Sequence, residues 1–320
     1  DFSEALKLFP AYAEAWKNRG LARVNRGVFR MDRGQDPEGD FADAIADYSA
    51  ALTLDSAHAE AWMRLGAARI LLANRKQMRG QNPDEEYGAA IADYDQALRR
   101  NPSLLDALMG RGMARINRGV LRMGRGLDPE EDYAAAIADY DVAIERNSAS
   151  VAAWMGRALA RNNWCEFKMR GREDPGEQYA AAIADYGEAL KLGPTNVVAL
   201  WQRGNVHWEM NRWAEAVADF EAALRIDPTS GRGQRDRLVI AHYNLACILS
   251  LRSAGKDSPE AAASPPSLAD AAALRDAALQ HLRQAVDLGW KDLKHLEGDA
   301  DLLPLRADPR WAELLRELKE

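Results

Sequence analysis

The chain has 320 residues, of which 47% are hydrophobic and 28% charged, and its formal net charge is -7 at pH 7. This composition is typical of a folded protein rather than a disordered one, and the acidic balance argues against a general affinity for nucleic acid. The two cysteines cannot form a disulfide framework, so we expect a reducing, cytoplasmic environment, and no apolar run predicts a membrane span.

The sequence begins with a short segment that matches the end of the repeats that follow it. Phe2 lies 46 residues before Tyr48. Phe2, Ala5 and Leu6 correspond to the close of the second helix of a repeat. We therefore expect residues 1–12 to be the remnant of a truncated repeat, and the sequence to be a fragment of a longer protein.

A period of 46 residues organises the next part of the chain. Tyrosines recur at this spacing, each at the end of the string Ala-Ile-Ala-Asp-Tyr: Tyr48, Tyr94, Tyr140 and Tyr186. A large residue and a small one, Trp16 and Gly20 in the first copy, keep the same spacing. The period predicts repeats at residues 13–58, 59–104, 105–150 and 151–196, and a shorter one of 34 residues at 197–230.

Each repeat is predicted to form two helices. On the first helix of the first repeat, Trp16, Gly20 and Val24 follow one another at helical spacing, and on the second helix Ile45 and Tyr48 do so. A small residue where two helices cross allows their backbones to approach. Because one hairpin cannot bury its apolar faces alone, we expect neighbouring hairpins to stack.

The four long repeats carry 12 extra residues between their two helices. In the first repeat this region, residues 26–41, is basic at its start, turns at an Asp-Pro pair and is acidic at its end. Val28 and Met31 continue the apolar stripe of the first helix, so we expect that helix to run past its usual end. Gly27 and Gly119 lie where a turn would otherwise be, which leaves a loop as the alternative.

Residues 231–320 do not follow the period. Residues 242–251 and 271–288 have the pattern of a helical hairpin, and residues 253–267, rich in Pro, Ser and Ala, predict a mobile loop between them. Residues 299–320 contain an Asp-Pro pair and a short amphipathic helix. A stack of hairpins needs a covered end, so we expect this region to be its cap.

The 34-residue repeat has the order large residue, Gly, Ala, aromatic, Ala, Pro: Leu200, Gly204, Ala216, Phe220, Ala223 and Pro228. This order resembles the tetratricopeptide repeat (TPR), and the resemblance extends over residues 1–230, with the extra 12 residues as a departure. It implies an all-α fold, a right-handed superhelical α-solenoid of helix-turn-helix repeats, closed by a C-terminal hairpin in residues 231–320.

The C-terminal region carries a second resemblance. It contains Tyr243-Asn-Leu-Ala-Cys, Ala285-Val-Asp-Leu-Gly-Trp and Leu303-Pro-Leu-Arg-Ala-Asp-Pro-Arg-Trp. These strings resemble the end module of bacterial, planctomycete-type TPR proteins, several of which are Ser/Thr kinases with the kinase domain before the repeats. The resemblance implies a bacterial protein and leaves open a role as the non-catalytic regulatory arm of a larger signalling enzyme.

No catalytic signature occurs in the sequence. It has no Gly-rich phosphate loop, no His-Glu-x-x-His and no Gly-x-Ser-x-Gly. The histidines have no metal-ligand spacing, and only His242 and His281 can meet, across the last predicted hairpin. We expect a chain that is not an enzyme and has no catalytic residues, no cofactor and no metal site.

The TPR resemblance implies that the first helices line a concave groove. Carried over by repeat position, the groove residues are Lys17, Met63, Met109, Met113, Met155, Trp201, Asn205 and Trp208. Methionines can adapt to an apolar or amphipathic segment. The alternative is that these residues pack between adjacent repeats. The Lys and Asn pattern with which some TPR proteins hold a peptide carboxylate is mostly absent.

An arginine in the first helix shares its repeat with an aspartate in the second. The predicted ion pairs are Arg19–Asp47, Arg111–Asp139, Arg157–Asp185 and Arg203–Asp219. The second repeat has Leu65 at the arginine position. A guanidinium held by a carboxylate would fix the register of each hairpin, and a phosphate-binding row is the alternative.

We interpret the chain as a scaffold that binds a peptide or helix of a protein partner in its groove. The alternatives are the regulatory arm described above and a structural array that associates with copies of itself, and the oligomeric state stays open. We expect neither a membrane nor nucleic acid as a partner, because the acidic residues of each insert nearly cancel its basic ones and few aromatic residues lie among them.

Overall fold

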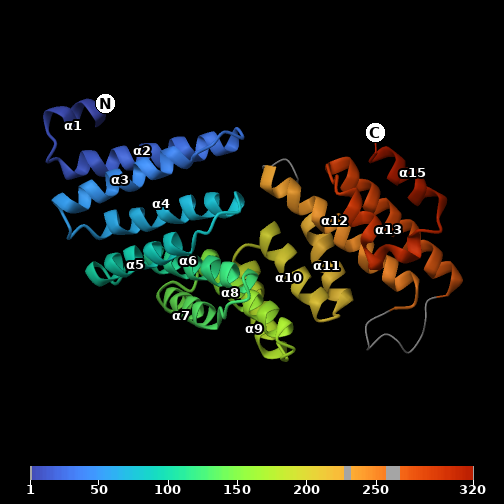
Figure 1. The fold of residues 1–320 in the computed structure, drawn as a ribbon. Helices are drawn as coiled ribbons and strands as arrows, with labels where there is room; N and C mark the ends of the chain where they lie inside the picture. The colour runs from blue at the N-terminus through green and yellow to red at the C-terminus, as the bar shows by residue number, and fades with distance from the viewer. Residues whose placement is uncertain (1, 227–231, 257–266, 320) are drawn as a thin grey trace. The chain divides into compact units, whose positions relative to one another are not determined.

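The computed structural model describes residues 2–226, 232–256 and 267–319, which form helices and their connections, with no strand among them (Figure 1). The chain divides into two compact units, residues 1–178 and residues 179–320. The prediction of an all-α helical-repeat solenoid is confirmed. None of the described helices combines the length and the apolar character needed to cross a membrane.

The helices of the long repeats have constant lengths. The first helices have 20 residues: α2 (Ala13–Asp32), α4 (Ala59–Met78), α6 (Leu105–Gly124) and α8 (Val151–Arg170). The second helices have 17: α3 (Glu38–Leu54), α5 (Asp84–Arg100), α7 (Glu130–Arg146) and α9 (Gly176–Leu192). The short repeat has 13 and 12: α10 (Val197–Glu209) and α11 (Trp213–Leu224). A short helix, α1 (Phe2–Leu8), precedes them.

The 12 extra residues of each long repeat therefore lengthen both helices of the hairpin. The first helix runs past its usual end, as predicted, and the alternative of a loop is wrong, since Gly27 and Gly119 lie inside α2 and α6. The turn between the two helices follows the end of the lengthened first helix, where Gly34, Gly80 and Gly126 have φ angles of 71°, 72° and 73°. Glycine adopts this left-handed conformation without a steric penalty.

Equivalent side chains have equivalent surroundings in successive repeats. The indole nitrogens of Trp16, Trp62 and Trp154 each donate a hydrogen bond to the carbonyl oxygen six residues upstream, at 2.8, 3.0 and 2.8 Å. Each bond ties the start of a first helix to the connection that precedes it. The hairpins are therefore stacked in register.

The core of the first unit lies between the repeats. Tyr94 of α5 is inserted between α4 and α6, so that a Cβ atom added at Gly66 or Gly110 would lie 3.0 or 2.5 Å from its ring. First helices of consecutive repeats pack on one another: α2 on α4, α4 on α6 and α6 on α8. Among the described helices of this unit, consecutive second helices have fewer contacts with one another than consecutive first helices have. The first helices therefore form one layer and the second helices another.

The second unit ends in a hairpin and its cover. The hairpin consists of α12 (Arg232–Ser253) and α13 (Leu268–Leu288), followed by α14 (Leu293–Gly298), the 3-10 helix η2 (Ala300–Leu305) and α15 (Pro309–Glu317). Tyr243 and Leu282 of the hairpin share one buried core with Leu296, Leu302 and Trp311. Most of the predicted mobile loop, residues 257–266, lies outside the described residues.

Candidate functional site

Five of the predicted groove residues lie on one face of the first helices of the first unit. They are Lys17, Met63, Met109, Met113 and Met155, and this surface is called the inner face below. All five side chains are half-buried. Because each helix has 20 residues, the inner face is about 30 Å long in the direction of the helices.

The methionines of the inner face have a packed side and an open side. Met63 packs against Tyr94, Ala97 and Ala107, which come from α5 and α6. Met109 likewise packs against a cluster formed by α6, α7 and α8. Each side chain therefore fills the junction between two repeats and still leaves part of its surface accessible. These methionines therefore pack between repeats and are also partly exposed on the inner face.

Lys17 is held by its own neighbours. Its ammonium lies 2.8 Å from a carboxylate oxygen of Glu14 and 3.8 Å from one of Glu60 in the next repeat. It also lies 3.3 Å from the Nε2 atom of His58. Only 13% of the Lys17 side chain is exposed. These contacts tie the first repeat to the second and leave little of the ammonium for a ligand carboxylate.

The other three predicted groove residues belong to the second unit and lie near α12. Asn205 accepts a hydrogen bond of 2.9 Å from the amide of Asn244 on α12. Trp201 and Trp208 are half-buried and pack against a cluster that includes Phe220 and Leu245. The last hairpin thus covers much of the surface of these three residues.

An amide row on the first helices was missed in the sequence. Asn25, Asn117 and Asn163 share one repeat position, the kind of recurrence that already identified the tryptophans. The amide of Asn117 donates a hydrogen bond of 3.3 Å to the Oδ1 atom of Asn74 in the preceding repeat. Tyr87 donates to the same oxygen at 2.6 Å. Asn25 of this row and Asn74 are both exposed, so α2 and α4 each present a polar amide.

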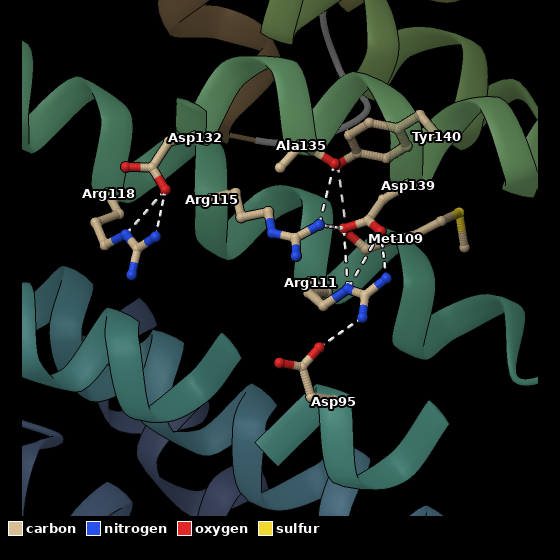
Figure 2. Close-up of polar contacts among 9 residues, drawn as sticks. All are labelled: Asp95, Met109, Arg111, Arg115, Arg118, Asp132, Ala135, Asp139 and Tyr140. Atoms are coloured by element: carbon tan, nitrogen blue, oxygen red, sulfur yellow. Dashed lines mark hydrogen bonds and ion pairs between the residues drawn. The ribbon is translucent and has the colours of Figure 1, made fainter. Parts of the chain in front are cut away.

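The ion pair of the third repeat is a network of two arginines and two aspartates (Figure 2). Arg111 donates through Nη2 to Asp139 at 2.5 Å and through Nη1 to Asp95 of the preceding repeat at 2.5 Å. Arg115 donates to Asp139 at 2.5 Å and to the carbonyl oxygen of Ala135 at 3.0 Å. Burial favours loss of the charge, but the hydrogen bonds and charges of the carboxylates outweigh it and raise the pKa of Arg111.

The other predicted pairs differ in how far they repeat this network. Arg19 donates to Asp47 at 2.6 and 3.0 Å. Arg203 donates to Asp219 at 2.5 and 2.9 Å. Arg157 donates to Asp141 at 2.6 Å, whereas its predicted partner Asp185 belongs to the second unit. The pairs Arg19–Asp47, Arg111–Asp139 and Arg203–Asp219 thus each join the two helices of one hairpin. The pairs Arg111–Asp95 and Arg157–Asp141 join a hairpin to the preceding one.

The second repeat lacks one arginine of the network. With Leu65 in its place, Asp93 pairs among the described residues with Arg69 alone, whose Nε donates at 2.8 Å. Burial raises the pKa of Asp93 to about 6, and the charge of Arg69 does not offset this. The substitution therefore leaves Asp93 with one arginine where Asp139 has two.

The insert adds a second ion-pair layer that resembles the first. Asp40 accepts hydrogen bonds from Arg26 at 2.5 Å and Arg30 at 3.1 Å. In the third repeat, Asp132 accepts from Arg118 at 3.0 Å and Arg122 at 3.0 Å. Each layer thus buries a carboxylate between two guanidinium groups, as the Asp139 layer does.

The sequence carried a signal for this second layer that was not used. Arg-Gly-x-x-Arg begins at Arg19 and again at Arg26, and an Asp-aromatic pair occurs at Asp40 and again at Asp47, each time seven residues apart. Seven residues are about two helical turns, so the copies lie on the same face of the hairpin. The insert therefore lengthens the hairpin and adds one more layer of ion pairs with the same arrangement of residues.

The two histidines singled out in the sequence do meet. The Nδ1 atoms of His242 on α12 and His281 on α13 lie 2.9 Å apart. Burial, and then the neighbouring imidazole, lowers the pKa of His242 to about 4. Burial also lowers the pKa of His281. Within the described part of the chain, no group of three or more His, Cys, Asp or Glu side chains is placed to hold a metal ion.

One protein-family model matches two parts of the chain. The family model of the tetratricopeptide repeat matches residues 38–75 and 176–231. These ranges include α3 with most of α4, and α9 to α11. No curated protein matches the chain.

Several solved structures are similar to this chain. One from Parabacteroides merdae is 18% identical, and the match covers 100% of this chain and 90% of that one with a TM-score of 0.50. YrrB, a TPR protein with an unusual peptide-binding site, is 17% identical over 72% of this chain and 93% of that one, with a TM-score of 0.44. A thermophilic TPR protein of Thermus thermophilus is 18% identical over 78% and 99%, with a TM-score of 0.43.

Proposed function

We propose that this chain of tetratricopeptide repeats is a cytoplasmic scaffold that holds a peptide or helical segment of a protein partner on the inner face of its first unit. The observation that carries the proposal is the row of half-buried methionines on consecutive first helices, Met63, Met109 and Met155. The proposed activity is binding, and the apolar side chains of the partner provide most of the contact.

The chemistry of the row supports an adaptable binding surface. A methionine side chain is unbranched and polarizable, so it can adjust to partners of different shape. Packing fixes the inner part of Met63 and Met109 and leaves the outer part available. Covering such apolar surface with a partner removes it from water, which is the main favourable contribution in most protein associations.

The size of the inner face favours a long segment. The 20-residue first helices offer a surface of about 30 Å, compared with about 20 Å for the 13-residue helix α10. A partner helix of five or six turns could therefore lie along the whole face. The exposed amides of Asn25 and Asn74 supply hydrogen bonds beside the apolar row, as polar groups around an apolar centre do in most interfaces.

The experiment replaces the methionines that are least involved in the core. A photo-crosslinking residue at position 113 identifies the partner, and the affinity of the purified partner is then measured for the wild type and for Met113→Glu and Met155→Glu. A buried glutamate in an apolar interface should weaken binding by about tenfold or more. Circular dichroism checks that each variant is folded.

The matched control is Leu127→Glu. Leu127 is an apolar side chain of the first unit with 53% exposure, and it lies in the turn after α6, beyond the end of the helix that carries Met109 and Met113. Its substitution should leave the affinity unchanged. If the two methionine variants bind the purified partner as tightly as this control does, the inner face is not the binding surface.

A further inference from the structure

Apolar side chains of the inner face form rows that run across the first helices. Two rows share repeat positions on α4, α6 and α8 and lie about one helical turn apart: Met63, Met109 and Met155, then Ala67, Met113 and Leu159. All six side chains are at least partly exposed, and the two rows are called the apolar band below. Some Cα atoms of α4 and α6, and of α6 and α8, lie within 8 Å of each other. Helices packed in this way have axes about 8–10 Å apart, so each row presents an apolar group at about that interval.

Side-chain amides border the apolar band on one side. Asn117 lies four residues, or about 6 Å, beyond Met113 along α6, and Asn163 has the same repeat position on α8. The exposed Asn74 of α4 accepts a hydrogen bond from Asn117 through its oxygen, and its NH2 group donates to none of the described residues. A side-chain amide can both donate and accept. This border therefore suits a peptide backbone whose own N–H and C=O groups are unpaired.

The amides and the spacing of the rows distinguish an extended partner segment from a helical one, which the proposed function leaves open. In an α-helix the backbone N–H and C=O groups bond to one another, whereas in a polyproline II helix they are unpaired. A polyproline II helix has about three residues per turn and rises about 3.1 Å per residue, so equivalent side chains recur about every 9.3 Å. This period matches the spacing of the first helices. The period of a β-strand, about 6.6 Å, does not.

Carboxylates border the apolar band on its other side. Glu60 and Asp106 share the repeat position three residues before Met63 and Met109. The Glu60 side chain is 40% exposed and lies 2.5 Å from the guanidinium of Arg64. Asp106 is exposed and forms no ion pair among the described residues. A basic side chain of the partner would pair with Asp106, and the formal net charge of -7 favours the approach of a basic segment.

We propose that the partner segment is a basic stretch in the polyproline II conformation that crosses α4, α6 and α8, with an apolar residue at every third position. The apolar residues lie on the apolar band, the backbone bonds to Asn74 and Asn117, and a basic residue pairs with Asp106. Contacts with three helices occupy about seven residues of the segment. The inference rests on the proposed function, because it concerns the same inner face, and it adds the conformation, sequence period and charge of the partner.

The experiment uses designed peptides as probes. A labelled peptide of four Leu-Pro-Lys units has leucine at every third position and favours the polyproline II conformation. Its matched control has the same composition with the leucines at consecutive positions. An amphipathic peptide of leucine and lysine, held helical by a side-chain crosslink, represents the helical alternative. Each peptide is titrated into the full chain, and fluorescence anisotropy measures the affinity.

The full chain is compared with three variants. Asn117→Leu removes an amide of the border without a large change in volume, and Asp106→Asn removes the unpaired carboxylate. Leu127→Glu, in the turn after α6, is the control. Thermal unfolding checks that each variant is folded.

The Leu-Pro-Lys peptide should bind saturably and at least about tenfold more tightly than its control peptide, because consecutive leucines reach fewer of the three helices. Asn117→Leu should weaken its binding by about threefold to tenfold through the loss of a hydrogen bond. Asp106→Asn should weaken it by about threefold through the loss of an exposed ion pair. Leu127→Glu should bind the peptide as the wild type does.

Equal affinity for the periodic peptide and its control, unchanged binding to Asn117→Leu, or the absence of saturable binding would overturn the inference. So would a preference for the helical peptide. If the helical peptide alone binds and Met113→Glu abolishes that binding, the proposed function holds and only the polyproline II inference fails. If Met113→Glu leaves unchanged the binding of every peptide and of the partner found by crosslinking, the proposed function fails as well.

Discussion

The ring of Tyr94 occupies the place where a side chain at Gly110 would be. A Cβ atom added at Gly110 would lie 2.5 Å from the Cζ atom of Tyr94, closer than Cβ atoms come to other atoms. Tyr94 belongs to the second repeat and Gly110 to the third, and Tyr140 has the same relationship to Gly156. The absence of a side chain at Gly110 and Gly156 therefore lets the tyrosine ring of the preceding hairpin pack directly against the helix at these two positions.

Replacing Gly110 with alanine should destabilise the first unit. The added methyl group must displace the buried ring of Tyr94, and overpacking of this kind costs about 1–3 kcal/mol. Gly124→Ala is the control, because no atom lies within 4 Å of a Cβ atom there and the helix gains up to about 1 kcal/mol. Urea unfolding measures both variants, and an unchanged midpoint for Gly110→Ala would show that the ring moves aside freely.

Removing the central carboxylate of the third repeat should cost more than removing its counterpart in the second. Asp139→Asn leaves Arg111 and Arg115 without their shared anion, at a cost of about 2–4 kcal/mol. Asp93→Asn should change the stability by less than about 1 kcal/mol at pH 7, because burial already disfavours that charge. Urea unfolding of both variants compares them, and equal costs would contradict the difference between the two sites.

The histidine pair should make the second unit less stable in acid. Both imidazoles have a lowered pKa in the folded chain, so the unfolded chain binds protons more readily. Stability is therefore complete above about pH 6.5 and falls as the pH decreases toward 4, by about 2 kcal/mol at pH 5. His242→Gln should reduce this slope. The control is His295→Gln, at an exposed histidine outside the pair, and a wild-type slope in His242→Gln would disprove the link.

The two cysteines should report separately on the opening of the two units. Cys165 lies in the first unit and Cys247 in the second, and both side chains are fully buried. Burial raises the pKa of Cys165 to about 12 and raises that of Cys247 further. Because the thiolate is the reactive form, iodoacetamide should modify neither thiol until its unit opens. Mass spectrometry during mild denaturation assigns each modification, and rapid labelling of the native chain would contradict the burial.

The sequence could predict the repeats because their signal is local and repeated. Tyr48, Gly20 and Trp16 recur at a fixed period, and the 3.6-residue spacing within each copy predicts two helices and the face that each one buries. The second layer of ion pairs was equally visible, since Asp40-Phe41 and Asp47-Tyr48 are seven residues apart, but only the longer period was read. The residues themselves therefore carried the signal for both layers of ion pairs.

Tertiary structure alone decided how open each predicted groove residue is. Periodicity assigns a residue to a face of its helix, but it does not say which distant segment covers that face. Lys17 forms ion pairs with Glu14 and Glu60. Asn205 accepts a hydrogen bond from Asn244, which lies 39 residues away in the sequence. The meeting of His242 and His281 also required the packing of α12 on α13.

The residues by themselves thus determined the helices, their period and the stacking of one hairpin on the next, because these depend on side chains at fixed short spacings. Only the folded chain decided which distant segment covers each face, as α12 does where Asn244 binds Asn205. Repeats of nearly identical sequence have identical local structure, and what differs among them is the neighbour that each one meets.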